Sequence, residues 1–145
     1  MLIPITLLGL TSWVAQKFNK ESMLQNFTRF GYALIALDMA AHIAHNLFHL
    51  LAEGKSIIFT GLALIGKSLG HDLSPALVGP ETIQLLQFGL IILGFAGSMF
   101  VVYRIARENY AKEKVWVTFA PYAVLMVVLG FLNLWLFVLP MAMRM

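Results

Sequence analysis

One stretch of the chain carries three of its four histidines, together with an aspartate, at helical spacing. Asp38, His42, His45 and His49 are separated by four, three and four positions, which places their side chains on one face of an α-helix. Glu53 continues that face. The surrounding residues are mostly apolar, so we expect this helix to lie in a membrane. Ionisable side chains are costly there and usually face a protein interior or a water-filled cavity, so the pattern indicates a binding face.

Three kinds of chemistry suit this face. In haem b ligation, two histidines of one helix cannot reach opposite sides of a porphyrin, so the second ligand must come from His71, a methionine or a partner subunit. In metal binding, His42, His45 and His49 would be ligands, because an i, i+4 histidine pair suits zinc or copper. In quinone binding, an imidazole and Asp38 would exchange protons with the head group. The fourth interpretation is structural, with the histidines bonded to neighbouring helices.

The composition places these residues in an integral membrane protein. The chain has 145 residues, of which 60% are hydrophobic and 12% charged, with a mean hydropathy of +0.83. Soluble domains carry about 25% charged residues, and a chain of this size is expected to form one domain, 1–145. The absence of cysteine excludes thiolate-ligated iron–sulfur clusters within this chain. The net charge of +3 requires no nucleic-acid partner.

The elements that position the histidines are predicted to be membrane-spanning helices. Residues 30–52, 83–105 and 115–139 each supply the roughly 20 apolar residues that a span needs. Residues 1–16 form a shorter run, which we interpret as a fourth, tilted or marginal span. An interfacial helix and the tail of a longer segment are the alternatives. Between the second and third spans, Gly54 is expected to end one helix, and residues 57–69 to form a short interfacial helix. The fold class is therefore an all-α membrane bundle of four helices.

The basic residues predict the orientation. They cluster between the first and second runs and between the third and fourth, at Lys17, Lys20, Arg29, Arg104, Arg107, Lys112 and Lys114. Loops rich in Lys and Arg usually stay in the cytoplasm, so both termini and the 53–81 loop are expected outside. Asp38 and His42 then lie near mid-bilayer, and His45 and His49 in the outer half. Gln84, Gln87 and Asn133 are expected at similar depth, where they could form a polar layer beneath the loop that carries His71. Gly94 and Ser98 form a small-xxx-small pair that favours close helix packing.

The segment from Asp38 to Gly54 resembles part of the membrane portion of polyferredoxin-type proteins, the membrane-bound iron–sulfur relatives of accessory subunits of periplasmic nitrate reductase and nitrous oxide reductase. The resemblance covers about one third of the chain, from about Gly31 through the outer loop. It implies a bacterial or archaeal cytoplasmic membrane, electron transfer between the quinone pool and a partner, and functional positions at His42, His45 and His49. Those proteins hold their clusters with cysteines, so this chain would correspond only to a membrane anchor, with the clusters on another polypeptide.

The sequence thus predicts a membrane subunit of an electron-transfer complex, either non-catalytic or with a quinone site. It would bind haem b, contact quinone, or both, through Asp38, His42, His45, His49 and His71, among other membrane and redox subunits. A metal-binding or metal-transport protein that uses the same histidines is the first alternative. A structural anchor is the second.

Overall fold

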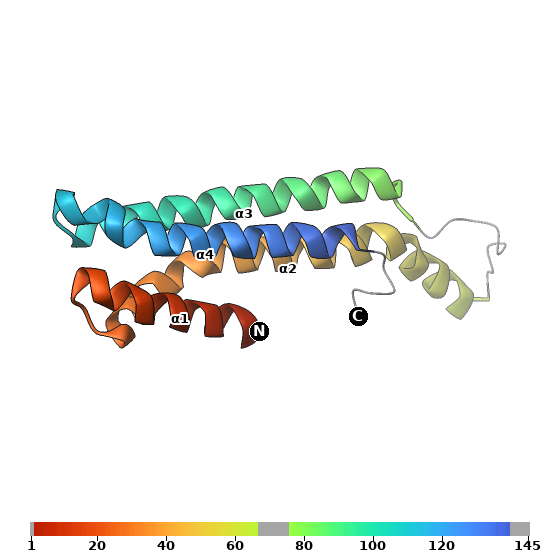
Figure 1. Ribbon diagram of the computed structural model, residues 1–145. Coiled ribbons are helices and arrows are strands. Elements are labelled where there is room, and N and C mark those ends of the chain that lie inside the picture. Colours follow the sequence, from red (N-terminus) through yellow and green to blue (C-terminus); the bar gives the residue numbers. More distant parts are fainter. Residues whose placement is uncertain (1, 67–75, 140–145) are drawn as a thin grey trace.

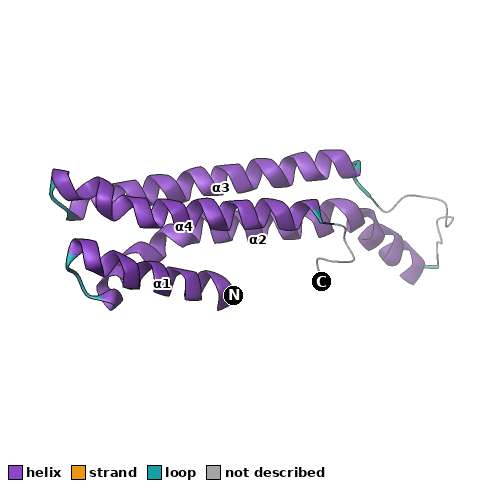
Figure 2. Ribbon diagram, viewed as in Figure 1, coloured by secondary structure: helices purple, strands orange, loops and turns teal. Residues whose placement is uncertain are grey.

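The computed structural model describes residues 2–66 and 76–139, and within these ranges the chain is helical with short connections and no strand (Figure 2). The helices are α1 (Leu2–Asn19), α2 (Met23–Leu64), α3 (Pro80–Asn109) and α4 (Lys112–Val138). Consecutive helices are antiparallel (Figure 1), and α1 packs against α2 and α4. The α-helical fold class is therefore confirmed.

Three of these helices are long and apolar enough to cross a membrane: α2, α3 and α4. They contain the predicted spans 30–52 and 83–105 and, up to Val138, the span 115–139. The fourth predicted span, 1–16, corresponds to α1, which is not among the three. Its 18 residues extend over about 27 Å at 1.5 Å per residue, so α1 is a short helix beside three longer ones.

The start of α2 is defined by its sequence. Ser22 is the N-cap, and its Oγ accepts a hydrogen bond from the backbone N–H of Gln25 at 3.3 Å. The Gln25 side chain in turn accepts from the backbone N–H of Ser22 at 3.1 Å. This capping box satisfies amides that a helix N-terminus otherwise leaves unpaired. The capping box thus fixes the start of α2 only a few residues after α1 ends at Asn19.

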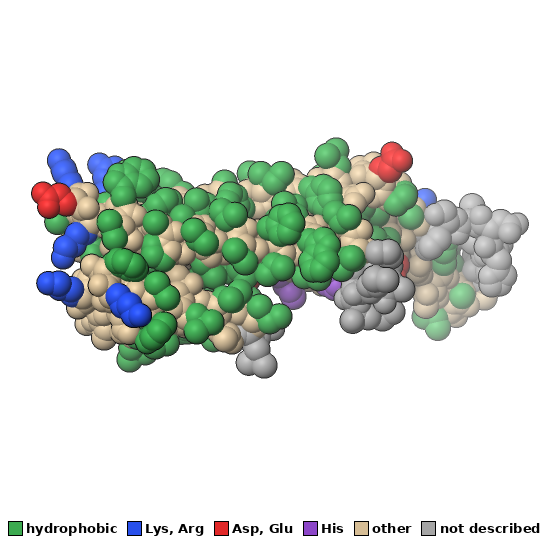
Figure 3. All heavy atoms as spheres, viewed as in Figure 1, with side chains coloured by type: hydrophobic (Ala, Val, Ile, Leu, Met, Phe, Trp, Pro, Cys, Tyr) green, Lys and Arg blue, Asp and Glu red, His purple; other side chains and the backbone are tan. Residues whose placement is uncertain are grey.

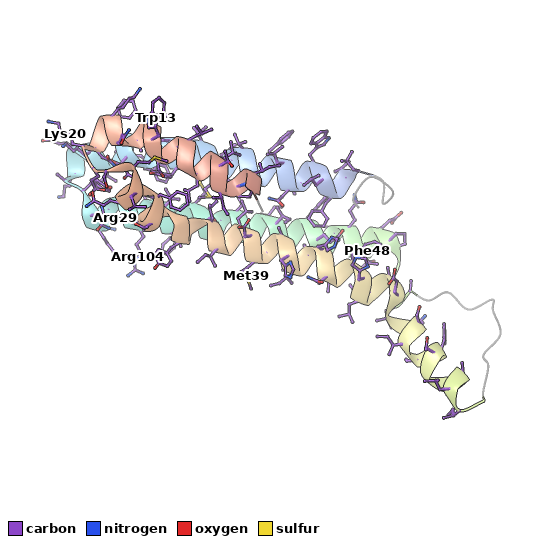
Figure 4. The ribbon with its side chains drawn as sticks, turned by 90° about the horizontal axis from the view of Figure 1, so that it is seen from below. Trp13, Lys20, Arg29, Met39, Phe48 and Arg104 are labelled. Carbon is purple, nitrogen blue, oxygen red and sulfur yellow. The ribbon has the colours of Figure 1, made fainter. Side chains whose placement is uncertain are left out.

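The prediction of a separate helix starting at residue 57 is wrong, because α2 continues without interruption from Met23 to Leu64. Gly54 does not end a helix. A Cβ at this position would lie 2.6 Å from Leu77 Cδ1, and the Leu77 backbone N–H donates to the Leu51 carbonyl at 2.7 Å. Gly54 thus permits the segment before α3 to approach α2 closely. Beyond this contact the last turns of α2 lead away from the other helices (Figures 1 and 4).

Small residues bring α2 and α3 into close contact, as the Gly94–Ser98 pair predicted. A Cβ added at Gly94 would lie 2.3 Å from Ala40 Cβ and 2.9 Å from the Ala36 carbonyl oxygen. One turn further, Ser98 Oγ accepts a hydrogen bond from the Leu37 backbone N–H at 3.0 Å. Both contacts are buried and involve the same face of α2. They determine which side of α2 points toward the core.

The remaining core joins α1, α2 and α4. The rings of Phe30 and Tyr122 stack with centroids 3.8 Å apart and an interplanar angle of 11°. The Tyr122 hydroxyl donates to Ser12 Oγ at 3.3 Å, and all three side chains are fully buried. The aromatic pair fills the centre of the bundle where four helices are present, so α1 is an integral part of the core.

A polar network ties the helices together at the end of the bundle that holds both basic connections. Asn19 and Asn26 are buried and hydrogen-bonded to each other, with Asn19 Nδ2 donating to Asn26 Oδ1 at 2.7 Å. Arg29 Nη1 lies 2.7 Å from Glu21 Oε1, and the Tyr110 hydroxyl donates to Glu21 Oε2 at 2.5 Å. Burial raises the pKa of Tyr110 to about 12, and its hydrogen bond to Glu21 acts in the same direction. The network links the α1–α2 turn to the end of α3.

Candidate functional site

The four predicted site residues of α2 lie on one exposed face, which we call the histidine face: Asp38, His42, His45 and His49. The opposite side of α2 is buried at Ala33, Leu37, Ala40 and Ala44. The single-faced arrangement predicted from spacing is therefore present. The chain's own core does not cover it, and Figure 3 shows histidine side chains on the surface beyond the N-terminal end of α1.

The histidine face begins beside the N-terminal end of α1. Pro4 of α1 lines a groove together with Ile35, Asp38, Met39 and His42 of α2, and the groove has a volume of about 460 Å³. Nearer the basic end, α1 lies along α2, with Leu8 against Gly31. Beyond Met39, α2 continues past Phe48 without α1 beside it (Figure 4). The bundle thus has four helices over one part of its length and three over the other.

Asp38 and His42 share this groove. They are one helical turn apart, and the other lining residues, Pro4, Ile35 and Met39, are apolar. A carboxyl group and an imidazole therefore face the same apolar space from one wall. Carboxyl and imidazole groups are side chains that commonly transfer protons at binding and catalytic sites. The groove therefore combines an apolar wall with two polar groups that can form hydrogen bonds.

His45 and His49 lie beyond the groove, on the side away from the basic end of the bundle. The imidazole rings of His45 and His49 have centroids 5.1 Å apart in an edge-to-face arrangement. His49 Nδ1 lies 3.9 Å from Glu53 Oε2, and both side chains are more than half exposed. No group of three histidine or acidic residues in the described part of the chain is arranged to hold a metal ion. A ligand held by these histidines would need a further donor from another chain or helix.

The predicted polar layer does not form around the histidines. Gln87 is buried, but its Nε2 donates to the Ala44 carbonyl at 2.9 Å, on the opposite side of α2. Gln84 is exposed, and Asn133 donates to the Leu129 carbonyl of its own helix at 2.9 Å. The prediction placed these residues by depth alone, whereas rotation about each helix axis decides which way they point. His71, the remaining predicted site residue, lies outside the described residues.

The part that sequence reasoning missed is the contribution of α1. Pro4 forms a wall of the groove, yet nothing in its residue type suggests a site. The only signal was that the run 1–16 is shorter than a full span. A short helix packed against a long one leaves a step at its end, and polar residues of the long helix lie at that step.

Comparisons of the chain with family models, curated proteins and solved structures found no match.

Proposed function

We propose that the protein is a membrane subunit of an electron-transfer complex and that its histidine face contacts quinone, with Asp38 and His42 at the head group. Haem b held by His45 or His49 is the second part of this proposal. The complex would lie in a bacterial or archaeal cytoplasmic membrane, with the basic end of the bundle on the cytoplasmic side. The observation that carries the proposal is the groove of about 460 Å³ that Asp38 and His42 share with apolar residues of α1 and α2.

The exposure of the histidine face supports a binding role. An aspartate and three histidines that face lipid would be strongly unfavourable at membrane depth. Their side chains are nevertheless exposed on the helix that carries the closest core packing. If they served only to join helices, they would be expected at those contacts, where Ser98 and Gln87 form the hydrogen bonds instead. A ligand or a partner that covers the histidine face removes this cost.

The chemistry of the groove suits a quinone. Reduction of a quinone to a quinol takes two electrons and two protons, and the reverse reaction releases them. The apolar wall of Pro4, Ile35 and Met39 would hold the ring and the start of the isoprenoid tail. The Asp38 carboxyl and the His42 imidazole, one turn apart, would bond to the carbonyl oxygens or exchange their protons. The electrons would come from or go to a redox centre on a partner subunit.

Haem ligation is favoured by a separate observation. His45 and His49 are exposed and belong to the part of α2 between Met39 and the turn after Phe48, which α1 does not accompany (Figure 4), so a porphyrin could lie against the helix there. One of them would be an axial ligand, and the other ligand would come from a partner helix, because one helix cannot supply both sides. In this proposal, Asp38 and His42 contact the quinone, and His45 and His49 serve the haem.

The quinone role can be tested in the purified complex by measuring quinone-linked electron transfer. We expect Asp38→Asn and His42→Gln each to slow it by about 10²-fold, the lower end of what a positioned acid or base contributes. Gln84→Leu is the matched control, since Gln84 is polar and exposed on α3, another helix that is long and apolar enough to cross a membrane, and it should leave the rate unchanged. Unchanged rates in the first two variants would refute the quinone role.

The haem role has its own test. The reduced-minus-oxidised absorption spectrum of the complex should show a b-type haem that is lost or shifted in a His45→Ala, His49→Ala double variant. An unaltered haem spectrum in that variant, or the absence of any haem Soret band in the wild type, would refute this part and leave the quinone site standing.

A further inference from the structure

A second groove lies at the opposite end of the bundle from His45 and His49, between α2 and α3. It has a volume of about 470 Å³ and is lined by Arg29 and Tyr32 from α2 and by Arg104 and Glu108 from α3. The two arginines come from neighbouring helices at the same end of the molecule (Figure 4). The volume is within the range of small-molecule sites. None of these residues belongs to the histidine face.

The surrounding charge is positive. The segments 17–29 and 104–114 contain seven Lys and Arg residues against three glutamates, and the basic side chains gather at this end of the bundle (Figure 3). A second depression beside the groove is lined by Arg104 and Arg107. An anion that approaches this end of the bundle is therefore attracted before it reaches the groove.

Both guanidinium groups have hydrogen-bonding capacity beyond their internal bonds. Arg29 contacts Glu21 and Tyr110 through Nη1 alone, at 2.7–3.2 Å. Arg104 contacts Glu108 through Nε at 2.7 Å. A guanidinium carries five N–H donors on three nitrogens. Within the described ranges, these are the only hydrogen bonds of the two side chains. Two nitrogens of each guanidinium therefore remain available to bind a ligand. The glutamates therefore position the two guanidinium groups but occupy only some of their N–H donors.

The apolar part of the groove distinguishes the kind of anion. Phe100, Val101 and Ile105 line it beside the arginines, and they belong to α3, a helix long and apolar enough to cross a membrane. Tyr32 is 69% exposed at the same level, as aromatic residues at a membrane interface often are. A soluble anion would gain nothing from this wall, whereas an acyl chain would. Basic pockets between membrane helices are known to bind acidic lipid head groups.

We infer that this groove binds one anionic phospholipid, with its phosphate between Arg29 and Arg104 and an acyl chain along Phe100, Val101 and Ile105. This inference is independent of the proposed redox role. Glu108 limits the affinity, because it takes one donor of Arg104 and repels the phosphate. Removal of the Arg104 charge should therefore weaken lipid binding, and removal of the Glu108 charge should strengthen it.

Native mass spectrometry of the full chain in detergent, titrated with phosphatidylglycerol, tests this inference. We expect one tightly bound lipid, and much weaker retention of phosphatidylcholine. Arg104→Gln should weaken binding about tenfold, as expected for loss of a charge-assisted contact, and Glu108→Gln should strengthen it. Arg104 is suitable because its side chain is 64% exposed, so its replacement leaves the fold intact.

Lys112→Gln is the matched control. It removes the same charge at the same end of the bundle, but Lys112 lines neither groove, so binding should change less than twofold. Three results would overturn the inference. If Arg104→Gln and Lys112→Gln weakened lipid binding equally, the lipid would be attracted by the overall positive charge of this end and not by the groove. Equal retention of both lipids would mean acyl-chain contact only. Displacement of the lipid by an equal concentration of inorganic phosphate would mean a site for soluble anions.

Discussion

Replacement of Gly94 by alanine should separate α2 from α3 and disturb the rotation of α2 that points the histidine face outward. The added Cβ would lie 2.3 Å from Ala40 Cβ and 2.9 Å from the Ala36 carbonyl oxygen. Ordinary contact between two carbons is about 3.5–4.0 Å. Both obstacles are fixed to the α2 backbone, so no side-chain rotation relieves the clash. The helices must move apart by about 1.5 Å at this point.

The net effect combines two opposing contributions. Alanine is favoured over glycine within a helix by about 0.5–1 kcal/mol. Overpacking a well-packed core costs about 1–3 kcal/mol, and the upper end applies here because neither partner can yield. We therefore expect Gly94→Ala to lower the free energy of unfolding by about 2 kcal/mol. The buried hydrogen bond between Leu37 and Ser98, one turn away, would be lengthened by the same movement.

Two glycines of α3 are matched controls. A Cβ at Gly89 would meet nothing within 4 Å, and one at Gly97 would lie 3.4 Å from Ala36 Cβ. Gly89→Ala should raise stability slightly, and Gly97→Ala should change it little. Thermal unfolding in detergent, followed by circular dichroism, gives the order of the three variants. If Gly94→Ala were as stable as Gly89→Ala, the described approach of α2 to α3 would be wrong.

The polar contacts give further predictions. Tyr110→Phe should lower stability by about 1 kcal/mol, because Asn19, Glu21 and Arg29 each lose a hydrogen bond to the hydroxyl, and chemical denaturation should show it. The raised pKa of Tyr110, about 12, means that the folded state keeps a proton that the unfolded chain releases near pH 10. Stability should therefore be full below pH 10 and fall between pH 10 and 12, more steeply in the wild type than in Tyr110→Phe; identical slopes would contradict this. Gln87→Ala should cost about 1–3 kcal/mol because Gln87 is buried and bonded to α2, whereas Gln84→Ala, at an exposed position, should be neutral in the same thermal assay.

The helices could be predicted from the sequence because long apolar runs and short polar connections leave few alternatives. The single face formed by Asp38 and the histidines followed from spacing alone, since the helical repeat fixes it. The close contact at Gly94 also followed from residue size. These features depend on local sequence, and one helix is sufficient to define them.

Features that depend on how helices are rotated against one another could not be predicted. Gln87 and the histidines were placed at one depth, yet Gln87 bonds to the buried side of α2. Gly54 was expected to end a helix, but α2 continues because the glycine serves a contact with Leu77. The groove beside Asp38 needs the end of α1 as a wall. Each of these features requires a second helix, and no pattern within one segment encodes it.

The central claim, that the histidine face is where the redox ligand binds, is tested most directly by labelling the complex with a photoreactive quinone. Mass spectrometry would then locate the modified residues. We predict labels on α2 between Ile35 and His42 and on α1 near Pro4, with protection by excess unlabelled quinone. Labels spread over the lipid-facing residues of α3 and α4, with none concentrated on that groove, would contradict the account.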